Sequence, residues 1–86
     1  MDPKASVTNV IWAIAGAVAF GERADIAEYI RALYGWIRAG GFRPSSTVYA
    51  QAIDDAIKTY GLDGDQARVL RRRARRAIPA YLLEVA

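Results

Sequence analysis

The sequence contains no cysteine and no histidine, and asparagine and glutamine are scarce. Without cysteine the chain can form neither disulfides nor thiolate nucleophiles, and without histidine it lacks the usual general base and most zinc ligands. Lysine is also rare, with two residues against ten arginines. This bias fits a heat-adapted organism or a GC-rich genome, although exchange of arginine for lysine is a weak thermal marker.

Side chains that could carry catalysis or hold a metal ion are equally sparse. The sequence has no nucleophile–base set and no glycine-rich phosphate loop with its lysine. Asp54 and Asp55 are adjacent on an expected helix, so they point in different directions and make a poor acid–base pair. The stretch "LDGD" resembles the start of a calcium loop, but the further oxygen ligands and the closing glutamate are missing. We therefore expect no enzyme, cofactor, metal or small-molecule substrate.

The chain is both short and apolar. Its length allows one domain, residues 1–86, yet 53% of the residues are hydrophobic. Because so small a domain has little interior, we expect part of this surface to be buried against other chains in a homo-oligomer. The apolar run Val10–Phe20 is eleven residues long, whereas a membrane span takes about 20, so we expect no bilayer crossing. The run also resembles a signal-peptide core, but Asp2 beside Lys4 is a poor positive start, so we do not expect secretion.

Helical periodicity and helix-ending residues predict an all-α fold of about four helices, with no strand. The predicted helices run from Pro3 to about Phe20 after a cap at Asp2, from about Arg23 to Ala39, from Ser45 or Ser46 to Tyr60, and from Gly64 or Asp65 towards the C-terminus. Gly61 is expected to end the third helix, and Asp63 with Gln66 resembles a capping box for the fourth. Pro79 cannot donate to the carbonyl of Arg75, which predicts a kink or a break there.

The first predicted helix is apolar on all sides, which is typical of a helix that is buried on all sides. Three amphipathic helices in 86 residues cannot easily wrap it, so we expect a neighbouring subunit to complete its cover. The residues expected to build this self-assembly contact are Val10, Ile11, Trp12, Ala13, Ile14, Gly16, Ala17, Val18 and Phe20. The alternative is that the helix is the central helix of a compact monomer.

Six of the twelve basic residues lie on the last predicted helix, at Arg68, Arg71, Arg72, Arg73, Arg75 and Arg76. At 100° per residue all of them except Arg73, which falls on the flank, lie opposite an apolar side. That side holds Ala67, Leu70, Ala74, Ala77, Ile78, Tyr81 and Val85. Like charges four residues apart destabilise a helix by a few tenths of a kcal/mol, and a solvated face usually mixes signs. We therefore expect an external anion, and the planar guanidinium fork suits phosphate.

The favoured ligand is thus the phosphate backbone of double-stranded DNA. An acidic partner protein, the Asp54–Asp55 pair of a neighbouring copy, a membrane surface and plain solvation remain as alternatives. The third and fourth predicted helices also resemble a helix-turn-helix around Gly61. However, Ile57 stands where the close helix crossing usually has alanine or glycine. Asp63 and Asp65 would place carboxylates at the end that normally faces DNA.

In size, helical character, apolar "VIWAIAGAVAF" and arginine-rich "RRRARR", the chain resembles the major coat proteins of rod-shaped or filamentous viruses of hyperthermophilic archaea. The resemblance implies small helical subunits that pack through hydrophobic interfaces around double-stranded DNA in a helical virion. We therefore expect a self-assembling coat protein, located in a virion, or in the cytoplasm or nucleoid. The alternative is a small dimeric helix-turn-helix regulator or nucleoid protein.

Overall fold

Four α-helices follow one another along the chain, and a short 3₁₀ turn completes the fold. The computed structural model describes residues 3–23, 25–41 and 43–84. The helices are α1 (Pro3–Phe20), α2 (Ala27–Arg38), α3 (Ser46–Tyr60) and α4 (Gly64–Ala77), and the 3₁₀ turn η1 spans Ala80–Leu82. Within these ranges the only extended pairing is an isolated bridge between Ser45 and Glu84. The predicted all-α class with four helices is confirmed.

Local capping signals explain most of the helix ends. The Ser45 hydroxyl accepts from the backbone N–H of Val48 at 3.1 Å at the start of α3, and Gly61 ends that helix with a φ of 60°. At the start of α4, a carboxylate oxygen of Asp63 accepts from the Gln66 N–H at 2.8 Å. The Gln66 side chain in turn accepts from the Asp63 N–H at 3.0 Å. The predicted capping box is confirmed, whereas the cap expected from Asp2 lies outside the described residues.

The second helix begins later than predicted. It starts at Ala27 rather than near Arg23, and Arg23 lies in the connection that follows α1. Ile26 occupies the N-cap position and makes no side-chain hydrogen bond to the first turn. Because no cap defines this helix start, packing of Ile26 and Ile30 against the core sets it instead.

Pro79 ends the fourth helix, as expected for a proline in that position. The helix stops at Ala77, and the chain then turns back towards the start of α3. The Ser46 N–H donates to the Glu84 carbonyl at 3.0 Å, and the Glu84 N–H donates to the Pro44 carbonyl at 2.8 Å. The prediction that Tyr81 lies on the apolar side of a continuing helix is wrong, because the break leaves its side chain 72% exposed.

The remaining members of that predicted apolar side behave differently from Tyr81. Ile78 is fully buried, and Ala77 is partly buried against the core. Leu82 and Leu83, which the sequence did not single out, are buried as well, because the 3₁₀ turn directs them inward. Val85 lies outside the described residues.

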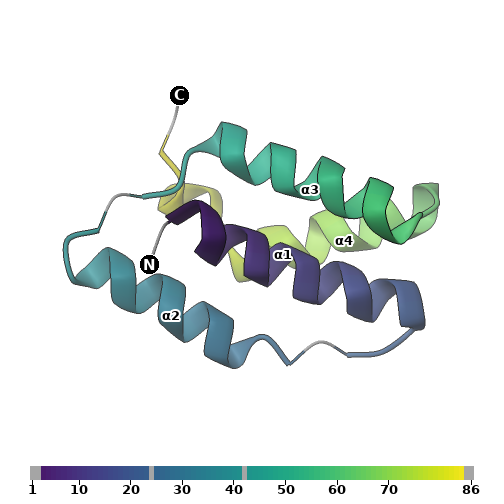
Figure 1. Ribbon diagram of the computed structural model, residues 1–86, viewed down its shortest axis with the longest axis horizontal. Helices are drawn as coiled ribbons and strands as arrows, with labels where there is room; N and C mark the ends of the chain where they lie inside the picture. Colours follow the sequence, from purple (N-terminus) through teal and green to yellow (C-terminus); the bar gives the residue numbers. More distant parts are fainter. Residues whose placement is uncertain (1–2, 24, 42, 85–86) are drawn as a thin grey trace.

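The first helix lies at the centre of the molecule, with the other three helices around it (Figure 1). Helices α3 and α4 pack mainly on α1 and little on each other. Small residues permit this close approach, and Gly16 leaves room for the Tyr60 ring, whose hydroxyl would lie 3.3 Å from a Cβ at that position. The same ring meets Trp12 edge-to-face, with ring centroids 5.9 Å apart.

The chain's own helices cover more of α1 than we expected, and the neighbouring subunit expected to complete its cover stays a prediction. Of the nine residues predicted to form a subunit contact, four are buried inside the chain's own core: Val10, Ile11, Ile14 and Ala17. Four more are partly buried: Trp12, Ala13, Gly16 and Val18. Only Phe20 is largely exposed, at 75%. These positions agree with the central helix that the alternative interpretation described, and they leave parts of four residues and Phe20 open to a neighbouring copy.

This arrangement predicts where truncation of α1 is costly. Replacing Ile11, which is fully buried, with alanine leaves a cavity and should lower the free energy of unfolding by about 2–5 kcal/mol. Replacing the exposed Phe20 should change it by no more than about 0.5 kcal/mol. Urea denaturation at several protein concentrations measures both. If Ile11→Ala lowers the free energy of unfolding only at high protein concentration, a second copy, rather than the chain itself, covers α1.

Candidate nucleic-acid interface

Helix α4 divides its side chains between an inner and an outer side. Ala67, Leu70 and Ala74 are buried on the inner side, where the two alanines let α4 approach α1 closely. The outer side carries the six arginines Arg68, Arg71, Arg72, Arg73, Arg75 and Arg76, and every one of them is exposed. We call these six residues the arginine face. The predicted separation of apolar and basic sides is thus present over the whole of α4.

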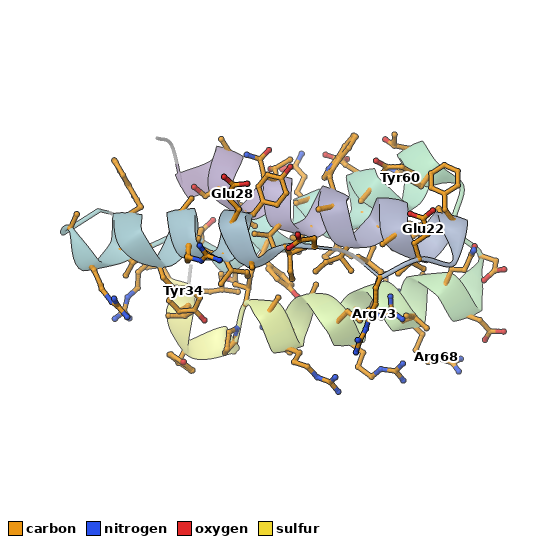
Figure 2. The ribbon with its side chains drawn as sticks, turned by 90° about the horizontal axis from the view of Figure 1, so that it is seen from below. Glu22, Glu28, Tyr34, Tyr60, Arg68 and Arg73 are labelled. Atoms are coloured by element: carbon orange, nitrogen blue, oxygen red, sulfur yellow. The ribbon has the colours of Figure 1, made fainter. Side chains whose placement is uncertain are left out.

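The arginine face has two edges that meet different parts of the molecule. Arg71 and Arg75 line a groove beside α3, whereas Arg73 and Arg76 line a hollow beside the connection between α1 and α2. Figure 2 shows Arg68 near the α3–α4 turn and Arg73 next to the α1–α2 connection. The flank position predicted for Arg73 therefore corresponds to one edge of the face, which Arg73 shares with Arg76.

Two of the arginines lie near carboxylates of the protein, but these contacts are loose. Arg68 lies 3.8 Å from Asp65, and Arg71 lies 3.9 Å from Asp54, and all four side chains are more than half exposed. Exposed pairs of this kind contribute about 0–1 kcal/mol and are screened by salt. Among the described residues, Arg72, Arg73, Arg75 and Arg76 have no ion-pair partner. Most of the positive charge therefore remains available to an external anion.

The edge beside α3 is a groove of about 830 Å³ between α3, α4 and the C-terminal segment. It exists because α3 and α4 diverge from their shared turn while both pack on α1. Arg71 and Arg75 line one wall, and the carboxylates of Asp54 and Glu84 also line the groove. Positive and negative side chains are therefore balanced on this edge.

Tyr49 lies in the same groove under the guanidinium of Arg75, whose Cζ is 4.8 Å from the ring centroid. This distance suits a cation–π contact. Burial raises the pKa of Tyr49 above its ordinary value, and the positive charge of Arg75 opposes part of that rise. Burial also raises the pKa of Tyr34, and the proximity of Tyr81 adds to the rise.

The opposite edge is a hollow of about 300 Å³. It is lined by Ile14, Arg23, Ile26, Arg73, Arg76 and Ala77. Arg23, in the α1–α2 connection, thus lies beside two residues of the arginine face. The sequence did not predict this position for Arg23. No local signal could have done so, because Arg23 precedes Arg73 by 50 residues and was placed at the start of a helix.

The residues around the α3–α4 turn fit a helix-turn-helix poorly. Helix α4 runs back in a direction roughly opposite to α3 in both views (Figures 1 and 2). The partly buried Ile57 packs against the core and is one of the larger side chains near the turn. Asp63 and Asp65 stand at the start of α4, where a recognition helix would meet base edges.

The raised pKa of Tyr49 predicts a loss of stability in alkali. Unfolded tyrosine loses its proton near pH 10, whereas folded Tyr49 retains it to a higher pH. The stability that the folded protein gains from the protonated Tyr49 hydroxyl is therefore complete below about pH 10, and it is lost as the pH rises through the pKa of the folded state. In urea denaturation, the free energy of unfolding of Tyr49→Phe should fall less between pH 9 and pH 11 than that of the parent protein. The fall that remains in the variant includes the contribution of Tyr34. Equal losses in the two proteins would contradict the burial of this hydroxyl.

Comparisons with known proteins leave the function to be argued from the residues themselves. No family model matches the chain, and neither a curated protein nor a solved structure matches it. Among the described helices, none combines the length and hydropathy needed to cross a membrane.

Proposed function

We propose that this protein binds double-stranded DNA through the arginine face and coats it as a self-assembling structural protein. The observation that carries the proposal is the exposure of six arginines on one side of α4, with only two long ion pairs among the described residues. A helical virion built from this subunit is the assembly that the resemblance to archaeal viral coat proteins suggests. A nucleoid coat would use the same contacts.

Repulsion within the arginine face favours a bound polyanion. Arg68, Arg72 and Arg76 follow one another at four-residue steps, which places them about 6 Å apart along the helix axis. Each like-charged pair opposes helix formation by a few tenths of a kcal/mol. Phosphate oxygens relieve this repulsion, and each guanidinium can hold two of them. A row of phosphates along a DNA strand supplies such oxygens at repeated positions.

The distribution of charge along α4 favours binding without sequence recognition. The arginines begin at Arg68 and continue to Arg76, whereas the first turn of α4 carries Asp65 and is capped by Asp63. Contacts to phosphates position a protein on DNA but do not identify bases. A chain that binds in this way gains the same contacts at every register, which is what a continuous coat requires.

Self-assembly must use surfaces other than the centre of α1, since that helix is covered by the chain itself. The largest exposed apolar side chains among the described residues are Phe20 and Tyr81, at 75% and 72% exposure. They lie at the end of α1 and in η1. We propose that contacts between copies bury these two aromatic rings once the subunits line up on DNA.

The first test measures how DNA affinity depends on salt. Each phosphate contact contributes a slope of roughly −0.9 to the plot of log affinity against log salt concentration. Arg72→Ala and Arg76→Ala should each lower the magnitude of the slope by about one on every duplex tested. Lys58→Ala serves as the control, because Lys58 is an exposed basic residue of α3 outside the arginine face. Titrations on several unrelated duplexes at two or more salt concentrations give these slopes.

The same titrations separate the proposal from its alternatives. Strong preference for one duplex sequence would contradict a coat and support a regulator. No binding to duplex DNA even at low salt would overturn the proposal and favour an acidic protein partner or a membrane surface. Tighter binding to RNA or single-stranded DNA than to duplex DNA would change the assigned nucleic acid.

The second test addresses assembly. Replacing Phe20 or Tyr81 with serine should shorten or abolish filaments on long duplex DNA, because each change removes an exposed apolar surface that neighbouring copies would bury. Ala80→Ser is the matched control, since Ala80 is exposed beside Tyr81 and receives the same side chain. Negative-stain images and sedimentation of protein–DNA mixtures report the outcome. Unchanged filaments in both variants would show that other surfaces join the copies.

A further inference from the structure

The hollow on the connection side of α4 brings together three guanidinium groups from two distant parts of the chain. Arg73 and Arg76 come from successive turns of α4, and Arg23 comes from the connection after α1. The hollow has a volume of about 300 Å³. This lies at the lower end of the range for small-molecule sites, which is about 300–1,000 Å³.

Among the residues that the structure describes, no carboxylate lines this hollow, in contrast to the groove on the other edge. Glu22 and Asp25 are near Arg23 in the sequence, but neither lines the hollow. Among the described residues, Arg23, Arg73 and Arg76 make no ion pair. Three like charges around one small space repel one another, and a phosphate placed between them would be held by charge-assisted hydrogen bonds.

The floor of the hollow is apolar and belongs to the packed core. Ile14 of α1 is 2% exposed, and the partly buried Ile26 and Ala77 pack against the same core. These three side chains come from three elements that are held in place by packing around α1. The hollow therefore offers a packed apolar surface beside exposed arginine side chains, which suits a ligand with one anionic group and one carbon-rich part.

We infer that this hollow binds one nucleotide unit of the DNA strand, with its phosphate between the three arginines and its sugar against the apolar floor. The inference rests on the proposed function and deepens it, because it assigns Arg23 as a DNA contact outside α4. It also places the bound strand: the strand passes over the edge of α4 towards the α1–α2 connection, not along the groove that Asp54 and Glu84 line.

The test on DNA compares Arg23 with a basic residue that does not line the hollow. Arg23→Ala should lower the magnitude of the salt slope by about one, whereas Arg23→Lys should retain the slope because the charge remains. Arg31→Ala is the matched control, since Arg31 is exposed on α2 and does not line the hollow. If Arg72→Ala lowers the slope and Arg23→Ala does not, the arginine face binds DNA without this hollow, and the inference is overturned.

A second measurement is independent of DNA coating. Isothermal titration at low salt with thymidine 5′-monophosphate and with inorganic phosphate should show tighter binding of the mononucleotide, because only it covers the apolar floor. Arg23→Ala and Arg76→Ala should each weaken mononucleotide binding by about tenfold. Arg31→Ala should not, since Arg31 is exposed on α2 and does not line the hollow.

The two measurements fail in distinguishable ways. If mononucleotide binding depends on Arg23 while duplex DNA is not bound, the hollow is a phosphate site and the proposed coating function is wrong. Equal affinity for inorganic phosphate and the mononucleotide would overturn the role of the apolar floor. If Arg23→Ala alters neither measurement, the inference is overturned as a whole.

Discussion

The fold depends on one constraint: α1 is apolar over most of its length, so most of its surface must be covered. Helices α2, α3 and α4 meet this requirement by turning their apolar stripes towards α1. Because α3 and α4 each pack mainly on α1, they pack little on each other and diverge from their shared turn. The same constraint determines which side of α4 faces outward. The exposure of the arginine face is thus a consequence of burying α1.

Charge along α4 follows the direction of the helix dipole. Asp63 caps the first turn and Asp65 lies within it, where the helix end is partly positive, whereas Arg75 and Arg76 lie in the last turn, where it is partly negative. The dipole therefore offsets part of the repulsion among the arginines. The same order of residues places the carboxylates of the first turn at the opposite end of the helix from Arg75 and Arg76. Local helix stability and the proposed phosphate binding consequently favour the same order of residues.

The two edges of the arginine face differ in their surroundings rather than in their own side chains. Beside α3, Asp54 and Glu84 balance Arg71 and Arg75, and Tyr49 lies under one guanidinium. Beside the α1–α2 connection, Arg23 adds a further positive charge, and no carboxylate of the described part of the chain lines the hollow. An anion is therefore attracted more strongly to the connection side. For the DNA binding proposed above, this asymmetry would favour one edge of a helix that looks evenly basic in sequence.

Helix boundaries that depend on local chemistry could be predicted from the sequence alone. Ser45, Gly61, the Asp63–Gln66 pair and Pro79 act within about four residues, so the limits of α3 and α4 follow from their immediate neighbours. The start of α2 has no such cap, and its prediction was wrong by about one turn.

The composition of the arginine face was likewise determined by the sequence, since 3.6 residues per turn place these arginines opposite Leu70 and Ala74. Only the tertiary structure decided what covers α1, because an all-round apolar pattern does not show whether the cover comes from the same chain. It also decided that Arg23 joins Arg73 and Arg76. Arg23 and Arg73 are 50 residues apart in the sequence, and the packing of the helices brings them together. No short stretch of sequence indicates such a contact.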